Sequence, residues 1–134
     1  MDSRIALKVN TVLTLRNIDG GVVRYTIHGE IGRGASCIVY DASYNNNSGI
    51  SRIVRIKECY PFSLSLYRDG EKLCCISEEE RAGFERQKRR FREGFDIGNE
   101  LSAVCGLTNS VVNTLDIYET NNTFYTVTTY MEGR

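Results

Sequence analysis

The stretch "GEIGRGASCIVYDA", residues 29 to 42, places two glycines one residue apart between an apolar approach and a strand-like exit. Runs of β-branched and aromatic residues on both sides predict a strand-turn-strand unit around the glycines. Glycine lets a backbone come close to a phosphate because it has no Cβ, but glycines also relieve positive φ in ordinary hairpin turns. The motif alone leaves both interpretations open.

Alternating apolar and polar residues continue the strand pattern outward from this unit. Turn formers at 17–21 and 45–49 separate neighbouring strands, and Asp69-Gly70 predicts a further hairpin. The strands expected in this half of the chain are residues 11–16, 22–31, 37–44 and 51–60.

The pattern changes at Ser77, where a charged and proline-free stretch predicts one long helix. Ser77 and Glu80 have the spacing of a capping box. An apolar stripe along the helix is expected at Phe84, Phe91, Phe95, Gly98 and Leu101. Two more strands, near 110–119 and 123–131, flank a turn at 120–122. This order predicts an α+β fold in which the helix packs on an antiparallel sheet.

The composition limits the function classes. The 134 residues carry 17 basic and 17 acidic side chains, so no overall field attracts nucleic acid. No apolar run approaches the roughly 20 residues of a membrane span, and the start of the chain lacks a secretion signal, which predicts a cytoplasmic protein without membrane insertion. Five cysteines without a C-x-x-C pair, and a single histidine, predict reduced thiols and no metal site.

Lys57 occupies the polar position of "IVRIK", one strand beyond the glycines. A lysine there can point back under the glycine hairpin, where its charge would meet phosphate oxygens. The alternative is an ordinary solvated lysine on a strand.

In this order, the motifs resemble the N-terminal lobe of a eukaryotic-type, bacterial Ser/Thr protein kinase over residues 25 to 133. The family's G-x-G-x-x-G-x-V is matched by Gly32, Gly34 and Val39, with Cys37 in the third glycine place, and its V-A-I-K by residues 54–57. "IKECYP" and "NNTFYTVTTYMEG" are similar to the family's third strand, and to its fifth strand and hinge. The resemblance implies a five-stranded antiparallel sheet with one long helix. Residues 1–24 are then an extension with an added strand, residues 25–134 run from glycine loop to hinge, and the second lobe is absent.

The resemblance also implies roles. Backbone N–H groups of the glycine loop would cover the ATP phosphates, Lys57 would hold the α- and β-phosphates, and Ile31 and Val39 would enclose the adenine. The Thr129 carbonyl and the Met131 N–H would bind the adenine edge, with Thr128 as gatekeeper. The implied nucleotide-binding set is Ile31, Gly32, Arg33, Gly34, Ala35, Val39, Arg55, Lys57, Thr128, Thr129 and Met131.

A helix glutamate would steady Lys57, and two positions compete for this role. Glu100 has the expected apolar frame of Ile97, Ala103, Val104 and Leu107, whereas alignment on "RRF" at 89–91 favours Glu93. The two are seven residues apart on one helix face, so spacing excludes neither. For both, the alternative is a surface glutamate paired with an arginine.

The sequence also departs from the family. Arg55 replaces a small alanine and Cys37 a glycine, and the chain contains neither the His-Arg-Asp loop nor the Asp-Phe-Gly motif that holds Mg²⁺. We therefore expect an ATP-binding lobe that is inactive alone and phosphorylates protein hydroxyls in the full-length protein. The alternative is a non-catalytic, kinase-like interaction module that binds a partner protein. Exposed apolar surface predicts that the isolated lobe self-associates.

Overall fold

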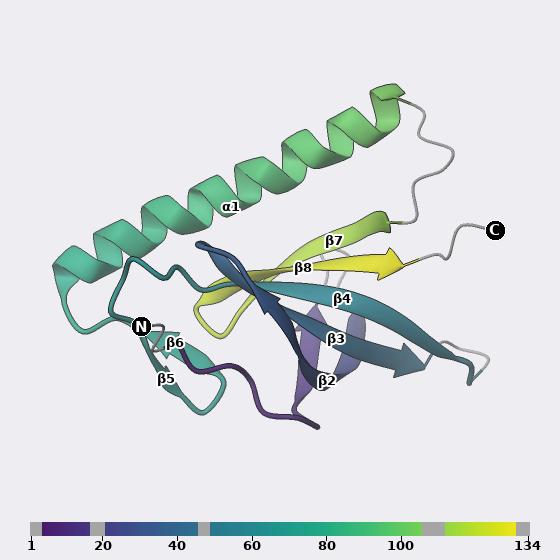
Figure 1. Cartoon of the computed structure of the whole chain (residues 1–134), viewed down its shortest axis with the longest axis horizontal. Coiled ribbons are helices and arrows are strands. Elements are labelled where there is room, and N and C mark those ends of the chain that lie inside the picture. The colour runs from purple at the N-terminus through teal and green to yellow at the C-terminus, as the bar shows by residue number, and fades with distance from the viewer. Residues whose placement is uncertain (1–3, 17–20, 46–48, 106–111, 131–134) are drawn as a thin grey trace.

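The computed structural model describes residues 4–16, 21–45, 49–105 and 112–130, and in these ranges the side chains of 4–16, 21–45, 49–94 and 117–128. Strands dominate the first half, one helix follows, and two strands end the described chain (Figure 1). The elements are β1 (Val12–Arg16), β2 (Val22–Arg33), β3 (Cys37–Asn45), β4 (Ser51–Cys59), β5 (Tyr67–Asp69), β6 (Lys72–Cys74), α1 (Glu78–Cys105), β7 (Val112–Thr120) and β8 (Thr123–Tyr130).

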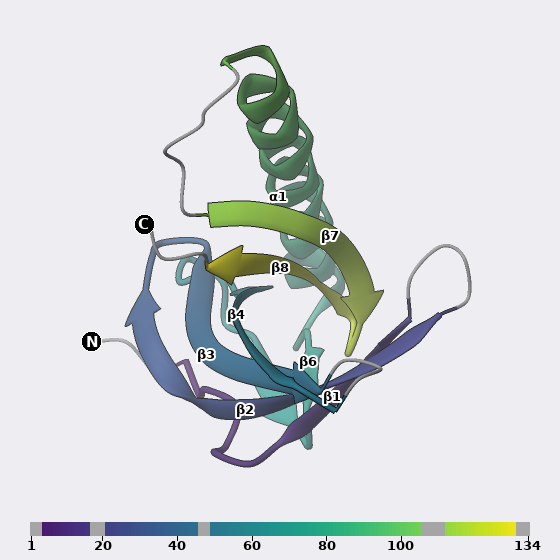
Figure 2. The same cartoon turned by 90° about the vertical axis from the view of Figure 1, so that its right-hand side faces the viewer.

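Six of the strands form one antiparallel sheet in the order β1-β2-β3-β4-β8-β7. The sheet curls so strongly that it is nearly barrel-shaped, as Figure 2 shows. The expected five-stranded sheet with an added strand is corrected to a sheet of six, because β1 pairs with β2 at all five of its residues and belongs to the same sheet. The prediction of an α+β arrangement with one long helix is confirmed.

The inside of the curl is the hydrophobic core. Side chains that alternate along the strands point into it, and several are fully buried: Leu15, Ile27, Ile38, Tyr40, Val54, Ile56 and Val127. Residues 4–16 share this core through Leu7, Leu13 and Leu15. Each large apolar side chain buried here contributes about 1.5–3 kcal/mol to folding. Register shifts at Ile27/Gly29 and Glu30/Gly32 are bulges that add to the bend of β2.

Two hairpins follow their turn sequences. The Asp-Gly prediction is confirmed because β5 and β6 pair antiparallel, with Gly70 at φ 63°. The predicted turn at 120–122 is also confirmed: Asn121 and Asn122 have φ values of 53° and 64°, as a primed hairpin turn requires. The predicted turn residues 17–20 and 46–48 lie outside the described residues.

The helix begins where Ser77 predicts, but only the Ser77 half of the predicted capping box forms among the described residues. The Glu80 N–H donates to Ser77 Oγ at 3.1 Å, while the Glu80 carboxylate accepts from the Ser65 N–H at 3.2 Å and so binds the preceding loop. Phe84 is buried and Phe91 half-buried against the core. The predicted stripe positions Phe95, Gly98 and Leu101 lie outside the described side chains.

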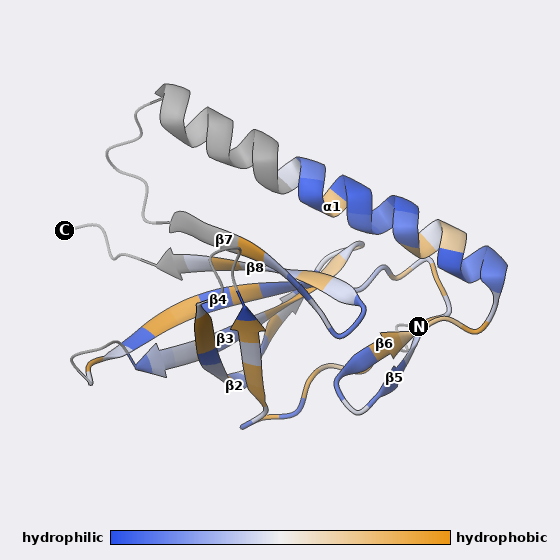
Figure 3. Cartoon of the chain, turned by 180° about the vertical axis from the view of Figure 1, so that it is seen from behind, coloured by the Kyte–Doolittle hydropathy of each residue, from blue (hydrophilic) through white to orange (hydrophobic). Residues whose placement is uncertain are grey.

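Helix α1 lies outside the curl, along β4, β7 and β8 (Figures 1 and 2). Much of its described surface is hydrophilic, with an apolar segment near its N-terminal end (Figure 3). Lys88 lies on the sheet side of the helix, where its ammonium donates to the Asn122 carbonyl at 3.3 Å and pairs with Glu85 at 2.8 Å. The sheet therefore has its core on one face, and the helix covers part of the other.

Candidate functional site

The glycine stretch is the hairpin between β2 and β3. The Gly34 N–H donates to the Cys37 carbonyl at 2.9 Å and closes a two-residue turn with Ala35 and Ser36 at its tip. All three residues from Gly34 to Ser36 are exposed. The hairpin tip therefore projects its backbone into solvent.

The fold itself does not require glycine at positions 32 and 34. Among the described glycines only Gly49 and Gly70 have positive φ, so the interpretation that the glycines of this hairpin relieve positive φ is wrong. A Cβ added to Gly32 would meet nothing within 4 Å, and one on Gly34 would only touch Cys37 Sγ at 3.8 Å. The small size of these residues leaves room for a molecule that approaches the backbone.

The segment after β4 holds the hairpin tip from one side. The Ser36 carbonyl accepts from the Tyr60 N–H at 2.9 Å, and the Ala35 carbonyl accepts from the Phe62 N–H at 2.8 Å. The N–H groups of Ala35 and Ser36 donate to no other residue in the described part of the chain. Two successive N–H groups without partners can bind an anion.

Lys57 lies in one cross-strand row with the glycine hairpin. Gly32 pairs with Val39, Val39 with Lys57, and Lys57 with Thr126. Cross-strand partners share a face, so the Lys57 side chain and Val39 lie on the same face of the sheet. Val39 is half-buried and Lys57 is exposed, which places an apolar residue between the hairpin and a cation.

The next row on this face contains Asp41, Arg55 and Thr128. Arg55 Nε lies 3.8 Å from Asp41 Oδ1, and the two side chains are 46% and 45% exposed. An ion pair that exposed contributes little to stability. The Thr128 hydroxyl donates to the Arg55 carbonyl at 3.3 Å, so the predicted gatekeeper is fixed against β4.

A helix glutamate, Glu93 or Glu100, is the predicted partner of Lys57. No carboxylate of the described side chains lies within ion-pair distance of Lys57. Glu93 is exposed on α1, and the Glu100 side chain lies outside the described residues. Both predictions therefore stay open.

The remaining predicted residues lie near the hairpin or outside the description. Ile31 is 45% exposed and is the extra residue of the β2 bulge between Glu30 and Gly32. Arg33 donates to the Arg4 carbonyl at 2.9 Å and pairs with Glu30, so its guanidinium binds protein groups. The side chain of Thr129, and Met131 as a whole, lie outside the described residues.

A buried polar cluster, which no sequence pattern predicted, lies on the opposite face of β4. Glu58 is fully buried, and its carboxylate accepts from the hydroxyls of Tyr40 and Tyr125, each at 2.7 Å. Arg68 completes the cluster with an ion pair at 2.7 Å. The available signal was Glu58 itself, a charged residue in the inward phase set by Val54 and Ile56. Burial, followed by the charge of Glu58, raises the pKa of both tyrosines.

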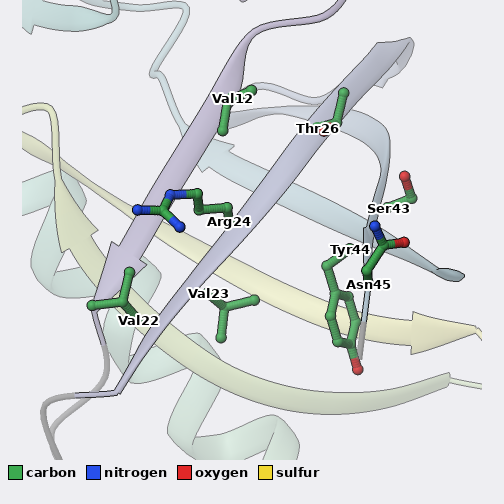
Figure 4. A pocket seen from close by; sticks show the side chains of 8 residues that line it. All are labelled: Val12, Val22, Val23, Arg24, Thr26, Ser43, Tyr44 and Asn45. Atoms are coloured by element: carbon green, nitrogen blue, oxygen red, sulfur yellow. The ribbon is translucent and has the colours of Figure 1, made fainter. Parts of the chain in front are cut away.

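A hollow of about 620 Å³ lies at the far end of β3 from the glycine hairpin (Figure 4). It contains none of the predicted site residues. Its lining comes from β1, β2 and β3: Val12, Val22, Val23, Arg24, Thr26, Ser43, Tyr44 and Asn45. This hollow is separate from the surface around Lys57.

The described ranges hold no group of three His, Cys, Asp or Glu side chains arranged to bind a metal ion. Nor is α1, the one helix in these ranges, apolar enough to cross a membrane.

The comparisons with known proteins give one informative match. No protein-family model and no curated protein matches the sequence. The fold is similar to a solved structure named "PpkA-294 apo form", with a TM-score of 0.66 and 21% sequence identity. The match covers 93% of this chain and 38% of that chain. The chain therefore shares its fold with part of that protein, over nearly its own full length.

Proposed function

We propose that this chain is the ATP-binding lobe of a Ser/Thr protein kinase, which in the full-length protein transfers phosphate from ATP to protein hydroxyls. The similarity in fold to PpkA-294, a name that denotes a bacterial Ser/Thr kinase fragment, supports the proposal. The motif matches at residues 32–39 and 54–57 support it independently.

One observation carries the proposal: the row Gly32–Val39–Lys57 lies beside two N–H groups that have no partner among the described residues. Phosphate recognition needs backbone donors that a ligand can approach closely and a cation within reach. Gly32 supplies the access, the tip at Ala35 and Ser36 supplies the donors, and Lys57 supplies the charge. Val39 offers an apolar contact for the adenine on the same face.

On this proposal, ATP binds on the face of the sheet that bears Lys57. Residues of a second lobe would hold most of the Mg²⁺, because the described side chains offer no cluster of metal ligands here. Arg55 lies in the row next to Lys57, where its guanidinium can stack on the base once it leaves Asp41. The residues of this chain bind and orient the nucleotide.

The test is calorimetric titration of ATP with Mg²⁺ into the full-length protein and its Lys57→Ala variant. We expect loss of the lysine to weaken ATP binding at least about tenfold, the change that 1.4 kcal/mol of lost charge-assisted binding produces. Arg52→Ala is the matched control, since Arg52 is an exposed cation on the same strand outside the proposed site.

Arg52→Ala should keep the wild-type affinity for ATP. An equal loss of affinity in both variants would show that only net charge matters, and it would contradict a site at Lys57. Absence of ATP binding in the wild-type protein would overturn the proposal as a whole.

A second candidate function is a non-catalytic, kinase-like interaction module. The Arg55–Asp41 pair favours it, because a long cation lies on the face where the kinase family has a small alanine. This function predicts that the full-length wild-type protein binds no ATP. ATP binding by the wild-type protein, lost in Lys57→Ala, would contradict it.

A further inference from the structure

Two cysteines lie directly opposite each other at the base of the glycine hairpin. Cys37 is the first residue of β3, Cys59 is the last of β4, and the two are cross-strand partners. Both lie on the face that bears Lys57, because Cys37 is two residues from Val39 and Cys59 two from Lys57. Cys37 also occupies the third glycine place of the sequence motif.

The hydrogen bonding shows how close this pair is. The Tyr60 N–H donates to the Ser36 carbonyl, so Ser36 and Tyr60 form a hydrogen-bonded pair. This pair is the direct neighbour of Cys37 and Cys59 in the ladder. Because hydrogen-bonded and non-hydrogen-bonded pairs alternate in an antiparallel ladder, Cys37 and Cys59 form a non-hydrogen-bonded pair. In such pairs the Cα atoms lie about 4.5 Å apart, within the range that a disulfide spans.

The two thiols have different surroundings. Cys37 is half-buried, and its Sγ lies 3.8 Å from the position of a Cβ on Gly34, so it is at the solvent edge of the hairpin. Cys59 is fully buried, and burial raises the pKa of its thiol to about 12. A reagent in solution therefore reaches Cys37 first, and Cys59 can react only with a group that Cys37 brings to it.

We propose that Cys37 and Cys59 form a reversible disulfide under peroxide, which locks the glycine hairpin to β4. The Cys37 thiolate attacks a peroxide oxygen, the O–O bond breaks, and a sulfenic acid and one water result. The Cys59 sulfur then attacks the Cys37 sulfur, and the leaving hydroxide takes the thiol proton as a second water. Two thiols lose two electrons, and hydrogen peroxide is reduced to two waters.

The disulfide constrains the part of the hairpin that the proposed function uses. The tip at Ala35 and Ser36 is already tied to residues 60 and 62 through its carbonyls. A covalent bond at the next pair prevents the tip from leaving β4. On the proposed function, on which this consequence rests, the locked tip cannot adjust the Ala35 and Ser36 N–H groups to the phosphates, and the oxidised protein binds ATP at least about threefold more weakly than the reduced protein.

The experiment exposes the purified protein to hydrogen peroxide, blocks remaining thiols with N-ethylmaleimide and maps the peptides by mass spectrometry. The expected product is a peptide pair joined through Cys37 and Cys59 that dithiothreitol separates. Hydrogen exchange of residues 34–37 should slow in the oxidised protein and return to its original rate after reduction. Both readouts are independent of ATP.

Two variants serve as controls. Cys37→Ser should abolish the joined peptides, while Cys75→Ser, which removes another half-buried thiol, should leave them unchanged. If Cys59→Ala folds, it should instead leave Cys37 oxidised and unpaired. Oxidation of Cys37 to sulfinic acid in the wild type, or disulfides that join it to Cys74, Cys75 or another chain, would overturn the proposal.

The ATP measurement separates the two proposals. A Cys37–Cys59 disulfide in a protein that binds no ATP in either state would leave the redox site standing and refute the proposed function. ATP binding that is equal in both states would show that the lock does not reach the nucleotide site.

Discussion

Lys57 and Glu58 are neighbours in sequence, point to opposite faces of β4 and have opposite surroundings. Glu58 is fully buried and bound by two tyrosine hydroxyls and Arg68. Lys57 is exposed and has no ion pair with any described side chain. Because burial of an ionised carboxylate requires partners, the Glu58 cluster serves the fold. Lys57 has no such partners among the described side chains, so its charge is not needed to balance a buried group. The face of the sheet that bears Lys57 is therefore the better candidate for binding a ligand.

The cluster also explains how the first residues of the chain are held. Arg68 donates to the Ile5 carbonyl at 2.7 Å, and Tyr40 accepts from the Leu7 N–H at 3.0 Å. Arg4 donates to the Tyr60 carbonyl at 2.7 Å. The groups around Glu58 thus fasten residues 4–7 to the curled sheet.

The largest expected effect on stability comes from a change in the buried Glu58 cluster. Glu58→Gln removes the charge that balances Arg68, whose side chain is only 5% exposed. We expect a loss of about 3–5 kcal/mol in the free energy of unfolding, a large share of a typical domain's stability. Urea denaturation measures it. Lys57→Gln is the matched control and should change stability by less than about 0.5 kcal/mol.

Equal stability losses in Glu58→Gln and Lys57→Gln would break the contrast between the two faces. Such a result would mean that Lys57 also stabilises the fold, and it would weaken the proposal that Lys57 is available to bind phosphate.

A smaller effect on the free energy of unfolding is expected at high pH, where buried tyrosine and cysteine side chains titrate. Burial raises the pKa of Tyr40 and Tyr125 above their ordinary value of 10.0, and that of Cys59 from 9.0 to about 12. Groups with a raised pKa in the folded state stabilise it fully below their unfolded pKa and lose this contribution as the pH rises. The free energy of unfolding should therefore fall steadily above about pH 9, as urea denaturation at a series of pH values would show.

Tyr125→Phe tests the origin of that fall. The variant is expected to start less stable, because Glu58 loses a donor, but to lose less stability per pH unit above about pH 10. A wild-type profile that stays level up to about pH 11 would contradict the assignment of buried, neutral tyrosines.

The smallest effect distinguishes glycines that the fold needs from those it does not. Gly70 has φ 63°, so Gly70→Ala should cost about 1 kcal/mol of unfolding free energy. Gly32→Ala should cost less than about 0.5 kcal/mol, since its Cβ meets nothing within 4 Å. Thermal denaturation compares the two variants, and a larger loss for Gly32→Ala would show that the hairpin depends on glycine for its own structure.

Much of the fold could be predicted because it depends on local patterns. The alternation of apolar and polar residues, together with many β-branched residues, predicted the strands to within a few residues. Ser77 predicted the start of the helix because its hydroxyl accepts a hydrogen bond from the Glu80 N–H in the first turn. The Asp-Gly and Asn-Asn turns adopt positive φ as their residue types favour.

The rest depends on contacts between residues far apart in sequence. Tyr125 and Glu58 are 67 positions apart, and Arg4 and Tyr60 are 56 apart, so no local pattern predicts either contact. The same holds for the six-stranded curl, because the place of β1 follows from its pairing with β2 and its share of the core. For the candidate site, strand alternation places Arg55 and Lys57 on one face of β4, whereas the position of Val39 beside Lys57 follows from the pairing of β3 with β4. The glutamate partner of Lys57 stays a prediction that names Glu93 or Glu100.

The most direct test of a nucleotide site on the Lys57 face is to titrate ATP into the ¹⁵N-labelled protein and follow its backbone amides by NMR. The predicted result is that the largest shifts occur at residues 32–36, Val39 and Lys57, and that Lys57→Ala reduces them. Shifts that gather instead around Arg24 and Asn45, at the hollow on the far end of β3, or no shifts at all, would contradict a phosphate-binding role for the glycine hairpin.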